Sequence, residues 1–160
     1  METPRENPRG YAFLRLAKFA VASALGFLVA EAIIFVGVLY LFHTAQVPSL
    51  DYSSPEIIGL DALAFGTGVT AAFLINERHT VPGAGRDASW PARWGKYQLS
   101  SLLGNVLIVV VQLALLATVS LSPVFGSIVG AVVTYPVTYV VSMRFVWGIS
   151  PLSSKATSGA

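Results

Sequence analysis

Four long apolar segments, separated by short polar ones, organise the chain. The clearest extends from Lys96 to Leu121 and carries no charge after its first residue. A helix needs about 20 consecutive apolar residues to cross the hydrocarbon core of a bilayer. The other three segments occupy about residues 14–42, 57–75 and 124–147. The pattern predicts an all-α membrane protein with four transmembrane helices.

The first and third segments share a layout, and so do the ends of the second and fourth. In the first pair of segments, each matched residue of the first segment precedes its counterpart in the third by the same number of positions. The matched residues are Lys18 and Lys96, Phe19 and Tyr97, Ala22 and Ser100, and Gly26 and Gly104. A second constant offset relates positions 76–81 to positions 142–147. The sequence therefore predicts two repeated helical hairpins. Because each repeat contains two spans, both should have the same orientation, related by an axis along the membrane normal.

These boundaries predict three parts of the chain. Residues 1–13 form a flexible or interfacial segment, 14–148 the transmembrane domain, and 149–160 a polar cytoplasmic tail. Hairpin one covers 14–79 and hairpin two 94–148. Proline, glycine and small polar residues in the connections are typical of turns. The first apolar segment is too long for the core of a signal peptide, so we expect a retained span.

The positions of the ten Lys and Arg residues predict the topology. They precede the first segment, lie between the second and third, or end the chain, and none lies in the other two connections. Cytoplasmic loops are enriched in Lys and Arg. Trp90, Trp94 and Trp147 fall at the same boundary, where indole rings favour the headgroup layer. We expect a multi-pass protein of the cell membrane with both termini in the cytoplasm, N-in/C-in.

Composition removes several classes of function. The chain is 54% hydrophobic and only 11% charged, too apolar for a soluble domain of 160 residues. It has no cysteine, which excludes disulfides and thiolate catalysis. Basic residues form no face for a nucleic acid. Common catalytic motifs are missing, and His43 and His79 are predicted at opposite membrane edges. We expect no enzyme activity, no cofactor and no metal.

The order and spacing of these motifs resemble the GtrA-like family, small four-span membrane proteins of cell-surface glycan synthesis. The likeness extends from about Leu14 to Gly148 and depends on the two basic-aromatic openings and the two closing motifs at 76–81 and 142–147. His79 and Val81 replace aromatic residues in the first closing motif, and Ser142 replaces asparagine in the second. The resemblance implies translocation of a polyprenyl-phosphate-linked sugar, or support of the glycosyltransferase that uses it.

Four basic residues are candidate ligands for the phosphate of such a lipid. They recur at matched positions on the predicted cytoplasmic edge: Lys18, Arg78, Lys96 and Arg144. Arginine offers a bidentate fork to phosphate, and lysine a point charge. Membrane topology alone also explains basic residues at these positions.

Polar residues inside the apolar segments are candidates for binding the sugar or lining a polar cavity. By its distance in sequence from Lys18, Glu31 lies about 20 Å into a hydrocarbon layer about 30 Å thick. It should face the bundle interior, be paired, or be protonated. The other candidates are Asn76, Asn105, Gln112, Tyr135 and Tyr139. The alternative for each is a hydrogen bond or a packing contact between helices.

Three hypotheses of function follow. The first is a flippase-like translocator of polyprenyl-phosphate-linked sugars in polysaccharide biosynthesis. The second is a non-catalytic subunit that anchors or activates a membrane glycosyltransferase. The third is a small proton-coupled exporter that uses Glu31. The expected partners are the lipid-linked sugar, membrane lipids and, for the second hypothesis, the transferase. Four spans are few for a closed path, which favours a homodimer or a groove open to lipid.

Overall fold

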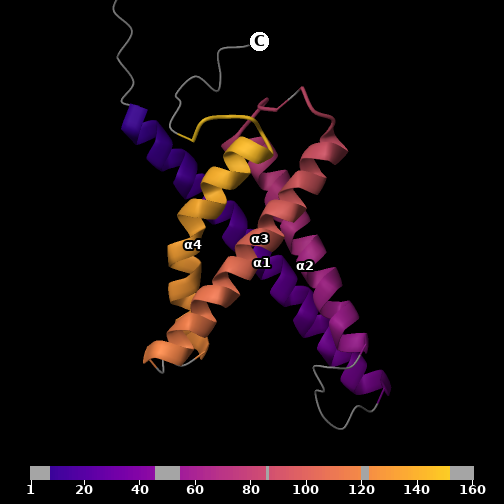
Figure 1. Ribbon diagram of the computed structural model, residues 1–160. Coiled ribbons are helices and arrows are strands. Elements are labelled where there is room, and N and C mark those ends of the chain that lie inside the picture. The colour runs from indigo at the N-terminus through magenta and orange to yellow at the C-terminus, as the bar shows by residue number, and fades with distance from the viewer. Residues whose placement is uncertain (1–7, 46–54, 86, 120–122, 152–160) are drawn as a thin grey trace, which may run out of the picture. The chain divides into compact units, whose positions relative to one another are not determined.

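The computed structural model describes residues 8–45, 55–85, 87–119 and 123–151 (Figure 1). These residues form α1 (Pro8–Ala45), α2 (Pro55–Ile75), the π-helix η1 (Asn76–Thr80), α3 (Trp90–Val119) and α4 (Pro123–Phe145), and the described ranges contain no strand. Four helices are long and apolar enough to cross a membrane. The predicted all-α fold with four spans is confirmed.

Proline places the beginnings of the helices. Pro8, Pro55 and Pro123 are the first residues of α1, α2 and α4, and Pro91 is the second residue of α3. Proline suits the first turn because its φ is already helical and no N–H is needed there. As a result α1 begins before residue 14 and α3 before residue 94, the predicted starts of the two hairpins. The turns expected at 46–54 and 120–122 and the tail beyond 151 lie outside the described residues.

Contacts divide the chain into two compact units. Unit one contains residues 18–80, which are most of α1 together with α2 and η1. Unit two contains residues 1–17 and 81–160, so the first turns of α1 belong with α3 and α4. Each unit contains one pair of long helices joined at one end (Figure 1).

In unit one, α1 and α2 approach each other at two glycines. A Cβ built on Gly26 would lie 2.5 Å from the carbonyl oxygen of Gly68 and 2.8 Å from the Cβ of Ala72. A Cβ on Gly68 would lie 2.6 Å from the carbonyl oxygen of Gly26. The two backbones therefore touch where no side chain fits, as small residues permit in membrane helices. Gly26, one of the matched positions of the repeat, is therefore where α1 meets α2.

In unit two, α3 and α4 pack in a similar way but with polar side chains in the contact. A Cβ on Gly104 would lie 2.9 Å from the hydroxyl oxygen of Thr138, and one on Gly130 would lie 3.0 Å from the carbonyl oxygen of Ile108. The hydroxyls of Ser100 and Ser142 are buried and hydrogen bonded at 3.1 Å. Close packing and one buried hydrogen bond therefore join the two helices.

The contacts in the two units fall at matched positions. Gly104 follows Gly26 at the offset that relates the third segment to the first. Thr138 follows Ala72 at the offset that relates positions 142–147 to positions 76–81. Ser100 and Ser142 correspond in the same way to Ala22 and Asn76, and all four of these residues are buried. Two copies of one hairpin would produce this arrangement, so the packing supports the proposed repeat.

Candidate functional site

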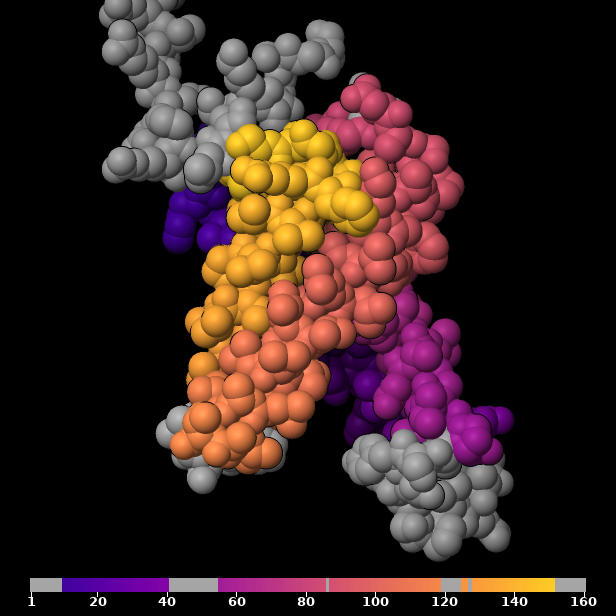
Figure 2. Space-filling view, viewed as in Figure 1, coloured from indigo at the N-terminus to yellow at the C-terminus, as the bar shows by residue number. Residues whose placement is uncertain are grey.

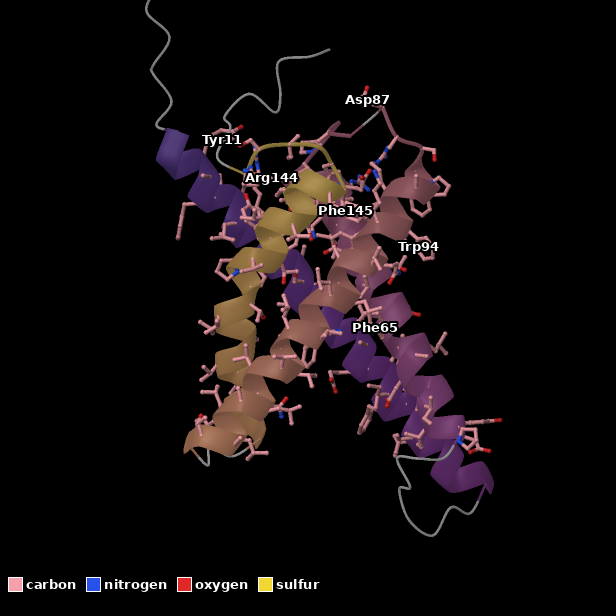
Figure 3. All side chains as sticks on the ribbon, viewed as in Figure 1. Tyr11, Phe65, Asp87, Trp94, Arg144 and Phe145 are labelled. Carbon is pink, nitrogen blue, oxygen red and sulfur yellow. The ribbon has the colours of Figure 1, made fainter. Side chains whose placement is uncertain are left out.

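One end of unit two brings together the first turns of α1, the segment 81–89, the start of α3 and the end of α4. Figure 3 shows Tyr11, Asp87 and Arg144 at this end. We call it the basic end of unit two, because Arg15, Lys96 and Arg144 belong to it. Its side chains come from parts of the chain that are far apart in sequence.

The segment 81–89 is held tightly against the end of α4. Gly85 has φ +70°, and a Cβ there would lie 3.1 Å from the Cα of Trp147 and 3.0 Å from the Cδ of Arg93. The Arg93 guanidinium donates to the carbonyl of Gly85 at 3.2 Å and also to that of Ala88. Trp147 is 2% exposed, and its ring centroid lies 5.6 Å from that of Tyr97. Aromatic packing and the Arg93 bonds thus give the basic end a fixed frame.

Replacing Gly85 with alanine should destabilise the protein more than the same change at Gly148. Both glycines have positive φ, +70° and +66°, a conformation that costs an L-residue about 1–2 kcal/mol. Only Gly85 also has close neighbours, since nothing lies within 4 Å of a Cβ at Gly148. Thermal unfolding in detergent measures the difference. Equal melting temperatures for the two variants would show that the contact with Trp147 is loose.

Arg15 is a buried cation that the sequence analysis used only as a topology signal. It lies within the membrane-spanning stretch of α1, is 5% exposed, and donates from Nη1 to the carbonyl of Ser150 at 3.5 Å. Its charge also acts on the phenol of Tyr139, which is itself 5% exposed. The sequence contains one sign that Arg15 belongs to the repeated pattern. Arg15 precedes Arg93 by the same interval that separates Lys18 from Lys96.

The four predicted phosphate ligands are divided between the units. Lys96 and Arg144 belong to unit two, where Lys96 is partly buried with its Nζ 5.5 Å from the ring centroid of Phe145 and Arg144 is exposed. Lys18 and Arg78 belong to unit one, and both are exposed. Unit two alone therefore combines Lys96 and Arg144 with the buried cation Arg15.

The predicted sugar-binding residues differ in exposure. Asn76 is fully buried in η1, and a π-helical turn of this kind often marks a functional position. Tyr139 is buried, and Tyr135 is partly buried with its hydroxyl inside the protein. Gln112 is partly buried beside Gly126. In contrast, the side chains of Glu31 and Asn105 are exposed on α1 and α3. The π-helix was not anticipated from the sequence.

These features define an integral, multi-pass membrane protein in which two helical hairpins carry basic and aromatic residues at the ends of the helices. The family model for the GtrA/DPMS transmembrane domain matches residues 59–147, more than half of the chain, and the chain belongs to this family. The match covers most of α2 together with η1, α3 and α4. No curated protein and no solved structure matches the chain. The family resemblance predicted from the sequence is confirmed, and membership assigns the protein to glycan and polyprenyl-linked sugar metabolism.

Proposed function

We propose that the protein translocates a polyprenyl-phosphate-linked sugar across the membrane during cell-surface glycan synthesis. The observation that carries the proposal is the basic end of unit two, where Arg15, Lys96 and Arg144 lie next to the apolar faces of membrane-spanning helices. A ligand with a phosphate headgroup and a long hydrocarbon tail is complementary to this combination of charge and apolar surface.

In this mechanism the polyprenyl chain stays in the lipid along exposed helix faces. Large apolar side chains of α3 are exposed, among them Leu102, Val106, Val110 and Leu113, and α3 is open on the face shown in Figure 2. Glu31 and Asn105 are polar residues on exposed sides of their helices. A sugar that moves along the outside of the helices would meet such groups at membrane depth, which favours a groove open to lipid over a closed path.

The proposed orientation places both termini and the segment 81–89 in the cytoplasm. Its support is the confinement of Lys and Arg to the N-terminal part, the region 78–96 and the C-terminal part of the chain. The basic end of unit two would then receive the lipid-linked sugar on the side where it is made from cytoplasmic precursors.

The test is translocation by the purified protein in sealed liposomes. A fluorescent polyprenyl-phosphate sugar should reach the opposite leaflet in vesicles that contain the wild type. Glu31→Gln, and Lys96→Ala combined with Arg144→Ala, should slow this movement at least about tenfold, the effect of raising the barrier by about 1.4 kcal/mol. Glu56→Gln is the matched control, because Glu56 is an exposed acid in the first turn of α2. Absence of movement with the wild type would contradict the proposal.

A second candidate is an accessory subunit that anchors or activates a membrane glycosyltransferase. The exposed position of Glu31 favours it, because an acid at membrane depth is usually covered by protein or water. The distinguishing result is copurification of a glycosyltransferase with the wild type and its loss with Glu31→Gln, in a preparation that does not translocate the lipid.

A further inference from the structure

Arg15 and Arg93 perform matched tasks in unit two. They occupy equivalent positions of the repeat, each in the first turns of the first helix of its hairpin. Arg93 donates to carbonyls of the segment that follows η1, and Arg15 donates to the carbonyl of Ser150, in the segment that follows α4. Each arginine thus holds the chain just after the second helix of a hairpin.

The two arginines differ in how many of their donors are used. A guanidinium has five N–H donors. Arg93 donates to two carbonyls, and the bond to Gly85 is 3.2 Å long. Among the described residues, Arg15 has one hydrogen-bond acceptor, Ser150, at 3.5 Å, although its side chain is only 5% exposed. A buried charge with a single long bond is costly, so the remaining donors of Arg15 favour an anionic ligand.

Tyr139 is a second buried polar side chain of unit two. The positive charge of Arg15 acts on the Tyr139 phenol, and both side chains are buried in unit two. A phosphate accepts two parallel N–H bonds from a guanidinium, and a phenolic hydroxyl can donate a further one. The guanidinium of Arg15 therefore has the donors that a phosphate requires.

We propose that Arg15 is the phosphate ligand of the basic end, and that the Ser150 carbonyl occupies its place in the ligand-free protein. A phosphate would replace one long bond to a neutral carbonyl with shorter, charge-assisted bonds. The identification of this phosphate as the headgroup of a lipid-linked sugar rests on the function proposed above. The assignment differs from the sequence-based one, in which the ligands are Lys18, Arg78, Lys96 and Arg144.

The experiment measures binding of a fluorescent polyprenyl-phosphate sugar to the full chain in nanodiscs. Arg15→Gln and Arg15→Lys should both weaken binding at least about tenfold, because lysine keeps the charge but loses the fork. Glu56→Gln, an exposed acid in the first turn of α2, is the control and should stay within about twofold of the wild type. Melting temperatures verify that each variant is folded. In the wild type, a photoreactive form of the probe should label residues adjacent to Arg15, which needs no substitution.

Each outcome separates this inference from the proposed function. Wild-type affinity in both folded Arg15 variants, or labelling confined to sites away from Arg15, overturns the inference even when the protein translocates the lipid. Binding that depends on Arg15 without translocation supports the inference and overturns the proposed function. Competition with inorganic phosphate identifies which kind of phosphate the site binds. Displacement of the probe indicates a general phosphate site, and lack of displacement indicates a site that also requires the lipid.

Discussion

Replacing Gly68 with alanine is expected to destabilise the protein by about 1–3 kcal/mol, the usual effect of overpacking. The new methyl group would lie 2.6 Å from the carbonyl oxygen of Gly26 and 2.9 Å from the Cβ of Ala30. Both neighbours belong to α1, and the nearest is backbone, so α1 and α2 must separate to accommodate it. Unfolding of the purified protein in mixed micelles of increasing SDS content measures the loss.

Gly66→Ala is the matched control for this prediction. Gly66 precedes Gly68 on the same helix, and a Cβ there has nothing within 4 Å. Alanine favours the helix over glycine, so this variant should be as stable as the wild type or more stable. Equal stability of the two variants would mean that the glycine contact between α1 and α2 does not exist in the membrane.

Replacing Trp147 with alanine is expected to cost about 3–5 kcal/mol, the range for large aromatic residues in a core. Trp147 is 2% exposed and its ring packs against that of Tyr97, which holds the backbone that Gly85 contacts. Its loss should also release the segment 81–89. Thermal unfolding and limited proteolysis of that segment, in the same detergent, are the two measurements.

The control for Trp147 is Trp90→Ala. Trp90 begins α3 and is 45% exposed, so its removal leaves a much smaller cavity. We expect its melting temperature to stay close to that of the wild type. If both tryptophan variants lost the same stability, the indole rings would act as membrane anchors and not as part of a packed end.

The length of the apolar segments was sufficient to predict the number and type of the helices. Their ends were less accurate, because the apolar pattern stops before the helix does. Residues Pro8 to Phe13 include polar and charged side chains, yet the backbone is helical from Pro8. Hydropathy reports the environment of the side chains, whereas proline and backbone hydrogen bonding decide where a helix begins.

The sequence pointed to some of the residues that belong to the basic end. Repeat spacing selected Lys96 and Arg144, which the structure assigns to the same unit. Arg15, the ligand proposed above, was not a candidate from the sequence, because sequence shows charge but not burial, and a cation near the end of a span is usually a topology signal. The π-helix η1 was missed because its wider turn leaves no trace in the apolar periodicity.

The serine that departs from the family motif has a local explanation. Ser142 replaces the asparagine found at the matched position, Asn76, and bonds to Ser100. The residue matched to Ser100 in hairpin one is Ala22. At the matched, buried positions hairpin one therefore has an alanine and a large polar residue, and hairpin two has two serines that bond to each other.

The division of the chain has a consequence for its synthesis. Unit one is continuous in sequence, so α1 and α2 can pack as soon as both have entered the membrane. Unit two joins the first turns of α1 to α3 and α4, and Arg15 meets its acceptor, Ser150, after α4. Since synthesis proceeds from the N-terminus, Arg15 has no acceptor until α4 and the residues that follow it have been made. The basic end therefore completes its packing after unit one.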